Sequence, residues 1–561
     1  MEKLLADHPK NTAQLRKFNK PIKKINYTLT KRGAVVKTDD IPSKLLNNIK
    51  NELTVKPKLP EEYGGDTSPF PLYSEEEGRI CVPRYYARNV FGKPNKRYGL
   101  TGEKVTLNFT GSLRSYQNEV VNETISQLNK RGGGIISLPC GYGKTIISLA
   151  LIAKLGLKTL VIVHKTFLQN QWYDRIKQFT DANIGVIRQR KIDVDGKDIV
   201  VGMLQSISMI DYNIDIFGSF GLVIYDEVHH SASRVFSQAL WKTGARYTIG
   251  LSATPIRKDG LTKVLSWYIG DVIYKIDRPG DNRVVVKKFT YESQDKLFTE
   301  KKMWSRAIHK VIPNVSRMIT NICKIKPRTQ FIVKCIKELI HQDERKLLIL
   351  SGRLAHLDEL KKDVDSYLDW EIKEGNLDPN EITTAYYIGK MKEYELNDAT
   401  EADIIFATYA MAEEGLDIPS LNTLLLVTPK TSIIQSIGRI LRKQIKEGDI
   451  PPVIVDIADN FSTFSNQATQ RSKYYMKQNY LIEEYKVLEE DVVTYKKYLS
   501  CKLNKSINEI HKQFPDLIDE PFETSLTDNL AIDLDKINAM VAETDCTKEE
   551  KAHPNMMFII G

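Results

Sequence analysis

Short runs of apolar residues recur along the middle of this chain, and most of them are followed by a segment with helical spacing. Strands this apolar are buried on both faces of a sheet, and their alternation with helices indicates parallel pairing. The runs form two series, the first at residues 134–138, 159–163, 199–203, 222–225 and 247–251, and the second at 346–350, 383–388, 403–408, 423–427 and 452–456. The predicted fold class is therefore α/β, with two tandem lobes that each hold a parallel sheet.

Length and composition exclude several classes of protein. The 561 residues correspond to three or four domains at the usual size of about 150 residues each. No stretch approaches the roughly 18 consecutive apolar residues of a membrane span, and the first residues lack the apolar core of a signal peptide. The six cysteines form no Cys-x-x-Cys pair, which disfavours a disulfide framework and a zinc ribbon and favours a reducing compartment.

The two series divide the chain into five expected parts. These are a basic N-terminal module (1–111), a first lobe (112–280), a partly helical bridge (281–340), a second lobe (341–465), and a helical extension with an acidic tail (466–561). Residues 1–58 hold 14 Lys and Arg against 5 acids, and we expect them to be loosely structured. Such a segment suits a polyanionic partner. The alternatives are padding folded against the first lobe, or docking on the acidic tail.

The segment Ile135-Ile136-Ser137-Leu138-Pro139-Cys140-Gly141-Tyr142-Gly143-Lys144-Thr145 joins an apolar strand to an apolar helix. Glycines let the backbone approach a ligand closely, so amide groups at the helix N-terminus can surround phosphate oxygens. Lys144 would reach the β- and γ-phosphates, and the Thr145 hydroxyl would bind Mg²⁺. Leu138 replaces the first glycine of the common G-x-x-x-x-G-K-[ST] pattern, so an incidental glycine turn is the alternative.

A pair of carboxylates, Asp226 and Glu227, follows the apolar run at 222–225. Open α/β sheets bind their ligands at the carboxyl ends of strands. Asp226 can hold Mg²⁺ there, and Glu227 can orient and deprotonate an attacking water. The combination with the glycine loop indicates an ATPase. The adjacent His229 and His230 point in different directions and have no third ligand nearby, so we expect no zinc.

Asp226-Glu227-Val228-His229 resembles the DExH box of superfamily 2 helicases, and the other motifs of that family occur here in the same order. Residues 113–117 resemble the upstream adenine-reading segment, and the glycine loop resembles motif I, in which the early glycine is not required. The resemblance implies nucleotide binding by Arg114, Gln117, Leu138, Pro139, Cys140, Gly141, Tyr142, Gly143, Lys144 and Thr145. Ser252, Ala253 and Thr254 resemble motif III, which couples hydrolysis to strand movement. Residues 256–260 are closer to the XPB-like branch and to the phage helicase UvsW.

The second lobe carries the remaining motifs. Gln435, Arg439 and Arg442 match Q-x-x-G-R-x-x-R, motif VI, and the resemblance implies that they act on the nucleotide from this lobe. Gly415 and Asp417 lie in a stretch that resembles motif V, and the resemblance places them at the nucleotide as well. Gly389-Lys390 is followed by methionine rather than a hydroxyl residue, so this lobe has no phosphate loop of its own. One ATP between two RecA-like lobes is therefore expected.

Nucleic acid would lie across both lobes, held mainly by phosphate contacts from loop amides, hydroxyls and basic side chains. The candidates are Lys165, Thr166, Gln205, Ser206, Arg353 and Thr408. For each of them an ordinary loop role is the alternative. Trp172 and the tyrosines at 474, 475 and 480 could stack on bases, but aromatic residues at helical spacing are more often part of a core.

The resemblance implies an ATP- and Mg²⁺-dependent helicase or translocase that binds nucleic acid and no membrane. Residues 257–260 favour DNA, while an RNA helicase is the alternative, because phosphate contacts do not separate the two. An inactive scaffold would have lost a motif residue, and none is missing. Residues 82–86 and 426–430 resemble helicases of large cytoplasmic DNA viruses, including the poxvirus transcript-release helicase. That narrower match implies viral transcription or genome maintenance, contact with transcription machinery, and an intracellular location in the host cytoplasm, the viral factory or the virion.

Overall fold

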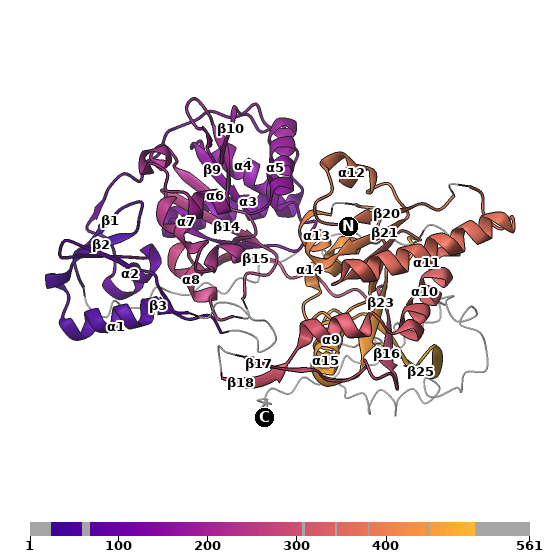
Figure 1. The fold of residues 1–561 in the computed structure, drawn as a ribbon. Coiled ribbons are helices and arrows are strands. Elements are labelled where there is room, and N and C mark those ends of the chain that lie inside the picture. Colours follow the sequence, from indigo (N-terminus) through magenta and orange to yellow (C-terminus); the bar gives the residue numbers. More distant parts are fainter. Residues whose placement is uncertain are drawn as a thin grey trace, which may run out of the picture.

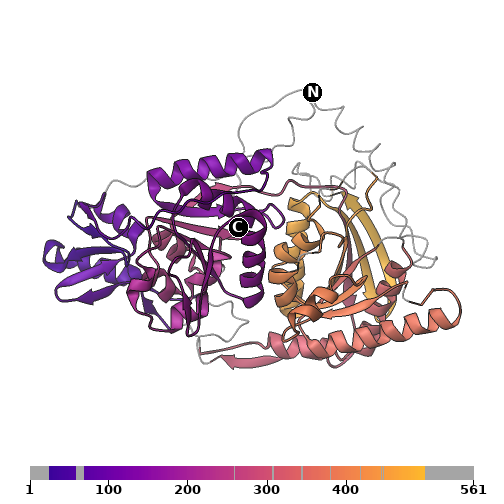
Figure 2. The ribbon, with the colours of Figure 1, turned by 90° about the horizontal axis from the view of Figure 1, so that it is seen from above.

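The computed structural model describes residues 24–58, 68–257, 259–305, 309–342, 345–379, 381–416, 418–443, 445 and 448–499. Figure 1 shows three folded parts, namely an N-terminal module in indigo, a first lobe in purple and magenta, and a second lobe in red to yellow. Figure 2 shows that the module lies on the side of the first lobe that faces away from the second lobe. No described helix is both long and apolar enough to cross a membrane.

The first lobe is built on an eight-stranded sheet with the order β11-β10-β12-β9-β13-β14-β8-β15. Every pairing is parallel except that of β10 with β11. The strands are β8 (Gly133–Ser137), β9 (Thr159–Val163), β10 (Ile184–Arg188), β11 (Lys191–Asp193), β12 (Ile199–Met203), β13 (Leu222–Tyr225), β14 (Tyr247–Ser252) and β15 (Val272–Lys275). The five predicted apolar runs are β8, β9, β12, β13 and β14, so the predicted α/β class is confirmed for this lobe.

Helices cover both faces of the first sheet, as its wholly buried strands require. One buried cluster joins Val120, Ile152 and Trp172, and a second on the opposite face includes Phe217 and Tyr268. The helices are α3 (Ser115–Arg131), α4 (Lys144–Leu155), α5 (Thr166–Phe179), α6 (Leu204–Met209), α7 (Ser237–Lys242) and α8 (Thr262–Tyr268).

The second lobe repeats the plan with an eight-stranded sheet, β20-β21-β19-β22-β23-β16-β24-β25, which is parallel except for the pairing of β24 with β25. Its strands are β16 (Val285–Glu292), β19 (Leu347–Ser351), β20 (Thr384–Tyr387), β21 (Ile404–Thr408), β22 (Thr423–Leu426), β23 (Val453–Asp459), β24 (Leu481–Leu488) and β25 (Asp491–Leu499). Its helices are α9 (Val315–Ile322), α10 (Lys326–Ile340), α11 (Leu354–Lys373), α12 (Glu393–Asp398), α13 (Tyr409–Gly415), α14 (Ile434–Ile440) and α15 (Ser462–Lys477).

Two segments differ from their expected roles. The bridge expected at 281–340 begins with β16, which lies inside the second sheet between β23 and β24. Lys287 and Lys288 conceal this strand in the sequence, and the structure pairs them with Glu483 at 3.5 Å and Glu484 at 2.8 Å on β24. The extension expected to be helical from 466 contains α15 but then continues as β24 and β25. Ion pairs between neighbouring strands therefore allow these charged residues to lie within a sheet, which the sequence pattern alone does not indicate.

The N-terminal module contains a five-stranded sheet with the order β5-β6-β2-β1-β7 and a separate two-stranded sheet of β3 and β4. Its elements are β1 (Thr28–Leu29), β2 (Ala34–Lys37), α1 (Ser43–Leu53), β3 (Thr54–Val55), β4 (Phe70–Pro71), β5 (Ser74–Glu76), β6 (Arg79–Val82), α2 (Arg84–Phe91) and β7 (Lys96–Arg97). Leu53 and Phe91 belong to the same buried cluster as Phe217 of the first lobe, and Arg84 donates to the Ala245 carbonyl at 2.9 Å. The expected loose structure is therefore wrong for residues 24–58, which fold against the first lobe. Residues 1–23 and the tail from 500 lie outside the described residues.

Candidate active site

The carboxyl ends of β8, β13 and β14 lie at one edge of the first sheet. Ser137 at the end of β8 pairs with Ser252 at the end of β14, and the Leu138 amide donates to the Ser252 carbonyl at 3.1 Å. Tyr225 at the end of β13 pairs with Gly250 of β14. Three motifs that are far apart in the sequence thus meet at the edge where α/β sheets bind ligands.

The predicted phosphate loop runs from β8 into α4. Gly141 and Gly143 have φ angles of +84° and +75°, in the left-handed region that favours glycine. Gly143 precedes α4 and no side chain caps this helix, so the amides of its first turn, where Lys144 and Thr145 lie, point into the loop. The Lys144 ammonium donates to the Leu138 carbonyl at 3.2 Å. This arrangement offers amides and one cation to an anion.

The other residues of the loop have distinct positions. The Leu138 side chain is fully buried, so this residue offers only its backbone. The Tyr142 amide donates to the Pro139 carbonyl at 3.4 Å, which closes the turn that contains Cys140. Gln117 holds the loop from α3, because its Nε2 donates to the Tyr142 carbonyl at 3.3 Å while its Oε1 accepts from the Arg114 amide at 2.9 Å. Both ends of the Gln117 amide are therefore engaged, and the Arg114 side chain is exposed.

Asp226 follows β13 and is held by Trp172 of α5. The Trp172 indole Nε1 donates to Asp226 Oδ2 at 2.9 Å, and the Glu227 amide donates to Asp226 Oδ1 at 3.0 Å. Burial and the neighbouring Glu227 charge raise the pKa of Asp226, and the Trp172 hydrogen bond and the Lys144 charge oppose that rise. Trp172 is 1% exposed, so the reading of this residue as a base-stacking side chain is wrong and the core reading is confirmed. A cation placed beside Asp226 would offset the cost of its buried charge.

Glu227 connects the carboxylate pair to the residues that resemble motif III. Its φ is +44°, an uncommon angle for a residue other than glycine. His229 Nδ1 lies 3.4 Å from Glu227 Oε2 and 3.1 Å from the Ser252 hydroxyl, and the same hydroxyl accepts from the Thr254 amide at 3.1 Å. Ala253 lies between those two residues and is half-buried. The His229 ring therefore joins Glu227 to the loop after β14.

Arg439 and Arg442 lie in the second lobe, at the end of α14 and just beyond it. Arg439 is buried and donates to the carbonyls of Glu413 and Leu416. Arg442 Nη2 donates to the same Leu416 carbonyl at 2.7 Å, and burial lowers the pKa of Arg442. Gln435 is half-buried in the first turn of α14, and Gly415 ends α13 directly before Leu416, whose carbonyl accepts from both arginines. Asp417 lies outside the described residues.

The phosphate loop and the motif VI residues touch across the two lobes. A Cβ atom built on Gly438 would lie 2.9 Å from the Cys140 Cβ, and one built on Gly141 would lie 3.5 Å from the Arg442 Cα. Arg278, on the segment between the lobes, donates to the Cys140 carbonyl at 3.0 Å and to the Leu441 carbonyl at 2.7 Å. The glycine loop therefore lies next to the segment that carries Arg439 and Arg442, as expected for one nucleotide between two lobes.

The candidates for nucleic-acid contact fall into two groups. Lys165 and Thr166 begin α5, and Lys165 donates to the Ala410 carbonyl of the second lobe at 3.2 Å. Gln205 donates to the His164 carbonyl at 2.6 Å, and Thr408 is the residue before α13. These four lie at the edge where the two lobes meet.

Ser206 and Arg353 are placed differently. Ser206 is 7% exposed, and its hydroxyl accepts from the Gln189 amide at 2.9 Å. Arg353 donates to the Thr320 hydroxyl at 2.9 Å and to the Ser316 carbonyl at 2.6 Å, both on α9. The structure therefore gives these two side chains internal partners, and their expected contact with phosphates has no support from the geometry.

Trp172 and Arg278 were not identified as site residues from the sequence. Trp172 follows Gln171 in a segment with helical spacing, and nothing local shows that its ring nitrogen reaches Asp226 after β13. Arg278 is followed by Pro279, Gly280 and Asp281, a sequence that predicts a solvent-exposed turn. Only the tertiary contacts assign these roles.

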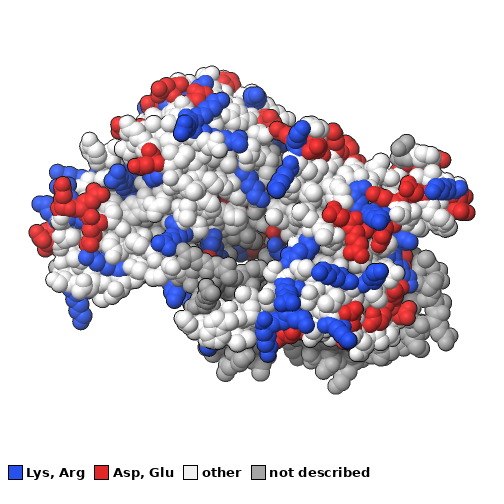
Figure 3. All heavy atoms as spheres, in the orientation of Figure 1, with Lys and Arg blue, Asp and Glu red and all other residues white. Residues whose placement is uncertain are grey.

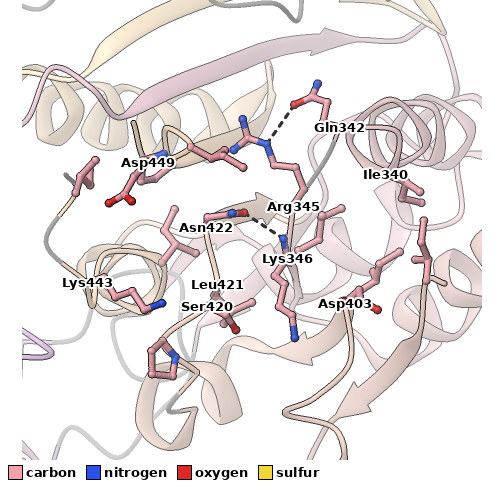
Figure 4. A pocket seen from close by; sticks show the side chains of 18 of the residues that line it. Ile340, Gln342, Arg345, Lys346, Asp403, Ser420, Leu421, Asn422, Lys443 and Asp449 are labelled. Atoms are coloured by element: carbon pink, nitrogen blue, oxygen red, sulfur yellow. Dashed lines mark hydrogen bonds between the residues drawn. The ribbon is translucent and has the colours of Figure 1, made fainter. Parts of the chain in front are cut away.

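A cavity of about 580 Å³ lies in the second lobe (Figure 4). It is lined by residues that precede strands, including Lys346 before β19, Asp403 before β21 and Asn422 before β22. Figure 4 shows Arg345 bonded to Gln342, and Lys346 bonded to Asn422. Because the cavity lies at the amino ends of the strands, it is separate from the edge where the motifs meet.

Comparison with known proteins identifies relatives over most of the chain. Residues 110–257 match the family described as type III restriction enzyme, res subunit. A protein of Acanthamoeba polyphaga mimivirus, named as an ATP-dependent RNA helicase, is 38% identical over 474 residues, which cover 83% of this chain and 88% of that protein. A protein of Invertebrate iridescent virus 6 named as a helicase is 30% identical and covers 68% of this chain and 85% of its own length.

A solved structure, that of T4 UvsW, aligns with a TM-score of 0.31 and 17% identity, and covers 83% of this chain and 100% of that chain. The matches to the two viral helicases extend well beyond the segment that the restriction-enzyme family covers. The chain therefore belongs to the superfamily 2 helicases, in the group that includes these viral proteins, and is an ATP-dependent, nucleic-acid-binding helicase.

Proposed function

We propose that this helicase hydrolyses ATP between the glycine loop of the first lobe and the arginine pair of the second, and that it uses this reaction to move on DNA. The observation that carries the proposal is the close approach of Cys140 and Gly141 to Gly438 and Arg442. A ligand bound on the loop amides would be within reach of both lobes. Its hydrolysis could therefore change how the lobes pack, which is the movement that a translocase requires.

The residues have separate proposed tasks in phosphoryl transfer, which depends on positioning and charge neutralisation. Lys144 neutralises the transferred phosphate, and the α4 amides hold it. Glu227 orients the attacking water and accepts its proton. Arg439 and Arg442 stabilise the charge that develops on the far side of the phosphate. His229 contacts both Glu227 and the Ser252 hydroxyl, and thereby holds Glu227 in position relative to the loop that contains Thr254.

Mg²⁺ fits the donor set at this edge. Among the described residues no group of three or more His, Cys, Asp or Glu side chains could hold a metal ion alone. Mg²⁺ in nucleotide sites typically takes one or two protein ligands and completes its shell with phosphate and water. Asp226 and the Thr145 hydroxyl are the two ligands that the edge offers. When bound, the ion would neutralise charge on the phosphates.

DNA is the proposed substrate because residues 257–260 resemble the XPB-like branch. Arg257 is fixed there by Asp259, with 3.0 Å between Arg257 Nε and Asp259 Oδ1, and by the His229 carbonyl, so this stretch is joined to the Asp-Glu motif. RNA is the second candidate, because the mimivirus relative and an African swine fever virus relative, 26% identical over 384 residues, are named as RNA helicases. We also propose a role in transcription or genome maintenance.

The test is the ATPase rate of the full-length protein without nucleic acid and with single-stranded DNA, duplex DNA or single-stranded RNA of the same sequence. Stimulation by either form of DNA that exceeds stimulation by RNA supports the proposal. Stimulation by RNA alone would replace it with the RNA candidate. Glu227→Gln protein is the control, because it should bind each nucleic acid without turnover.

A further inference from the structure

A two-stranded hairpin that follows β16 and precedes α9 in the chain exposes large apolar side chains. It consists of β17 (Lys302–Ser305) and β18 (Lys310–Pro313). Trp304 is 56% exposed and Val311 is 59% exposed. Burial of such side chains is the norm, so an exposed cluster on a projecting element indicates a binding surface.

The register of the hairpin gathers these side chains on one face. Trp304 pairs directly with Val311, so the two lie side by side on the same face. Lys302 lies two residues before Trp304 and therefore shares that face. Met303 pairs with the buried Ile312 on the opposite face. The exposed face thus presents an indole, an isopropyl group and an ammonium group.

The sequence on either side of the hairpin is strongly basic. Residues 296–326 contain eight Lys and Arg against one acid, Glu300, and Glu300 accepts from the Ser462 hydroxyl and lies 3.5 Å from Lys302. Figure 3 shows further basic side chains around the hollow between the lobes. This charge complements a polyanion rather than the surface of an average protein.

The hairpin is anchored to the rest of the second lobe. The Asn314 amide donates to the Lys301 carbonyl at 2.6 Å and leads into α9, and Val315 and Met318 of α9 pack with Phe464. Arg353 binds α9 through Ser316 and Thr320, so the hairpin is linked to the start of α11. Figures 1 and 2 show it projecting from the second lobe toward the side of the first lobe. An anchored tryptophan at this place can contact a nucleic-acid strand that leaves the hollow between the lobes.

We propose that the β17–β18 hairpin is a stacking surface for the bases of single-stranded nucleic acid, with Trp304 as the stacking side chain and Lys302 contacting the adjoining phosphate. The inference rests on the proposed nucleic-acid substrate and adds a second contact outside the helicase motifs. Stacking on an aromatic ring accepts every base, which suits an enzyme that moves along a sequence. Movement of the second lobe would carry the hairpin with it.

The test compares full-length wild type, Trp304→Ala and Trp304→Phe with the control Trp370→Ala, which removes another tryptophan of the same lobe that is 51% exposed on α11. Affinities are measured for a labelled single-stranded oligonucleotide and for an abasic strand of the same length, which keeps the phosphates and lacks the bases. Trp304→Ala should bind the normal strand roughly 5- to 150-fold more weakly. It should bind the abasic strand like wild type, Trp304→Phe should recover most of the loss, and Trp370→Ala should change neither affinity.

Equal affinity of wild type and Trp304→Ala for the normal strand would overturn the inference and assign the face to a protein partner. An equal loss on both strands would also overturn it, because the ring would then act without the bases. ATPase activity without nucleic acid should be unchanged in all variants. A wild type that binds no oligonucleotide would overturn the proposed function as well, whereas a failure confined to the Trp304 comparison leaves that function standing.

Discussion

The two lobes have the same kind of sheet, yet only the first presents a loop that can bind phosphate. In the first lobe, glycine precedes α4 and no side chain caps the helix, so the amides of the first turn face the loop. In the second lobe, the equivalent turn after β19 is closed by side chains. The Gly352 amide donates to the Thr428 hydroxyl at 2.8 Å, and the Arg353 amide donates to the Ser351 hydroxyl at 3.1 Å.

This difference shows that sheet geometry alone does not make a nucleotide site. Both lobes bring helix N-termini to the carboxyl edge of a parallel sheet, and both helix ends carry the same partial charge. Neither α4 nor α11 has a side-chain cap, so what separates the lobes is the turn before the helix, where the second lobe binds the Gly352 and Arg353 amides with its own Thr428 and Ser351 hydroxyls. The second lobe instead contributes Arg439 and Arg442, and the Cα and Cγ of Arg442 lie close to Gly141 of the glycine loop.

Replacing Lys144 with alanine should have the largest effect on ATP hydrolysis of all the substitutions. The ammonium is the one charge within the loop, so we expect ATP hydrolysis to fall to background while the melting temperature changes little. Steady-state ATPase assays and thermal unfolding measure the two effects. Lys390→Ala, in the second lobe, is the matched control and should keep normal turnover. Near-normal hydrolysis by folded Lys144→Ala protein would show that the loop is not the phosphate site.

Glu227→Gln should give the next largest effect, a loss of roughly 10²- to 10⁴-fold in turnover. The amide keeps the shape of the side chain but cannot accept the proton of the attacking water. Nucleotide affinity, measured by equilibrium binding of a labelled ATP analogue, should remain close to that of wild type. A variant that lost affinity rather than turnover would place Glu227 in binding and not in proton transfer.

Arg442→Ala tests the contribution of the second lobe and should lower turnover by roughly 10²- to 10³-fold. Arg442 is half-buried, with its Cα and Cγ near Gly141, so we expect nucleic-acid affinity to stay unchanged. Arg471→Ala offers the contrast, because Arg471 forms a buried ion pair with Asp456 at 2.8 Å. That change should cost stability, about 3–5 kcal/mol. If Arg442→Ala lost stability in the same way and turned over normally, Arg442 would be a structural residue too.

Trp172→Phe should have the smallest effect, and it tests whether Asp226 is held in position as a ligand for Mg²⁺. Loss of the indole donor frees Asp226 Oδ2 from its fixed position, so the Mg²⁺ concentration for half-maximal ATPase should rise about 10-fold. Turnover at saturating Mg²⁺ should largely recover. Trp241→Phe, in α7 of the same lobe, is the control for the loss of an indole. An unchanged Mg²⁺ requirement in Trp172→Phe would mean that this hydrogen bond does not prepare a metal ligand.

The first lobe and its phosphate loop could be predicted because the information is local. Residues 135–145 contain the strand, the glycines and the start of the helix in one continuous segment, and Asp226 and Glu227 directly follow an apolar strand. Burial of these strands on both faces could be predicted because their residues are almost all apolar. Each of these features depends on residues that are neighbours in the chain.

The features that could not be predicted depend on contacts between distant residues. β16 was hidden because Lys287 and Lys288 read as surface until Glu483 and Glu484 are brought beside them. Trp172 and Arg278 acquire their roles from Asp226 and from the Cys140 and Leu441 carbonyls. Ser206 and Arg353 matched the positions of phosphate contacts, but Gln189, Ser316 and Thr320 satisfy them inside the protein.

The number of nucleotides bound per chain distinguishes a single site on the first lobe from a site on each lobe. Equilibrium binding of a labelled ATP analogue should be measured with Glu227→Gln protein, alone and combined with Lys144→Ala or Lys390→Ala. One nucleotide per chain, lost with Lys144→Ala and kept with Lys390→Ala, is the predicted result. Two nucleotides per chain, or binding that survives Lys144→Ala and is lost with Lys390→Ala, would contradict a single site built on the first lobe.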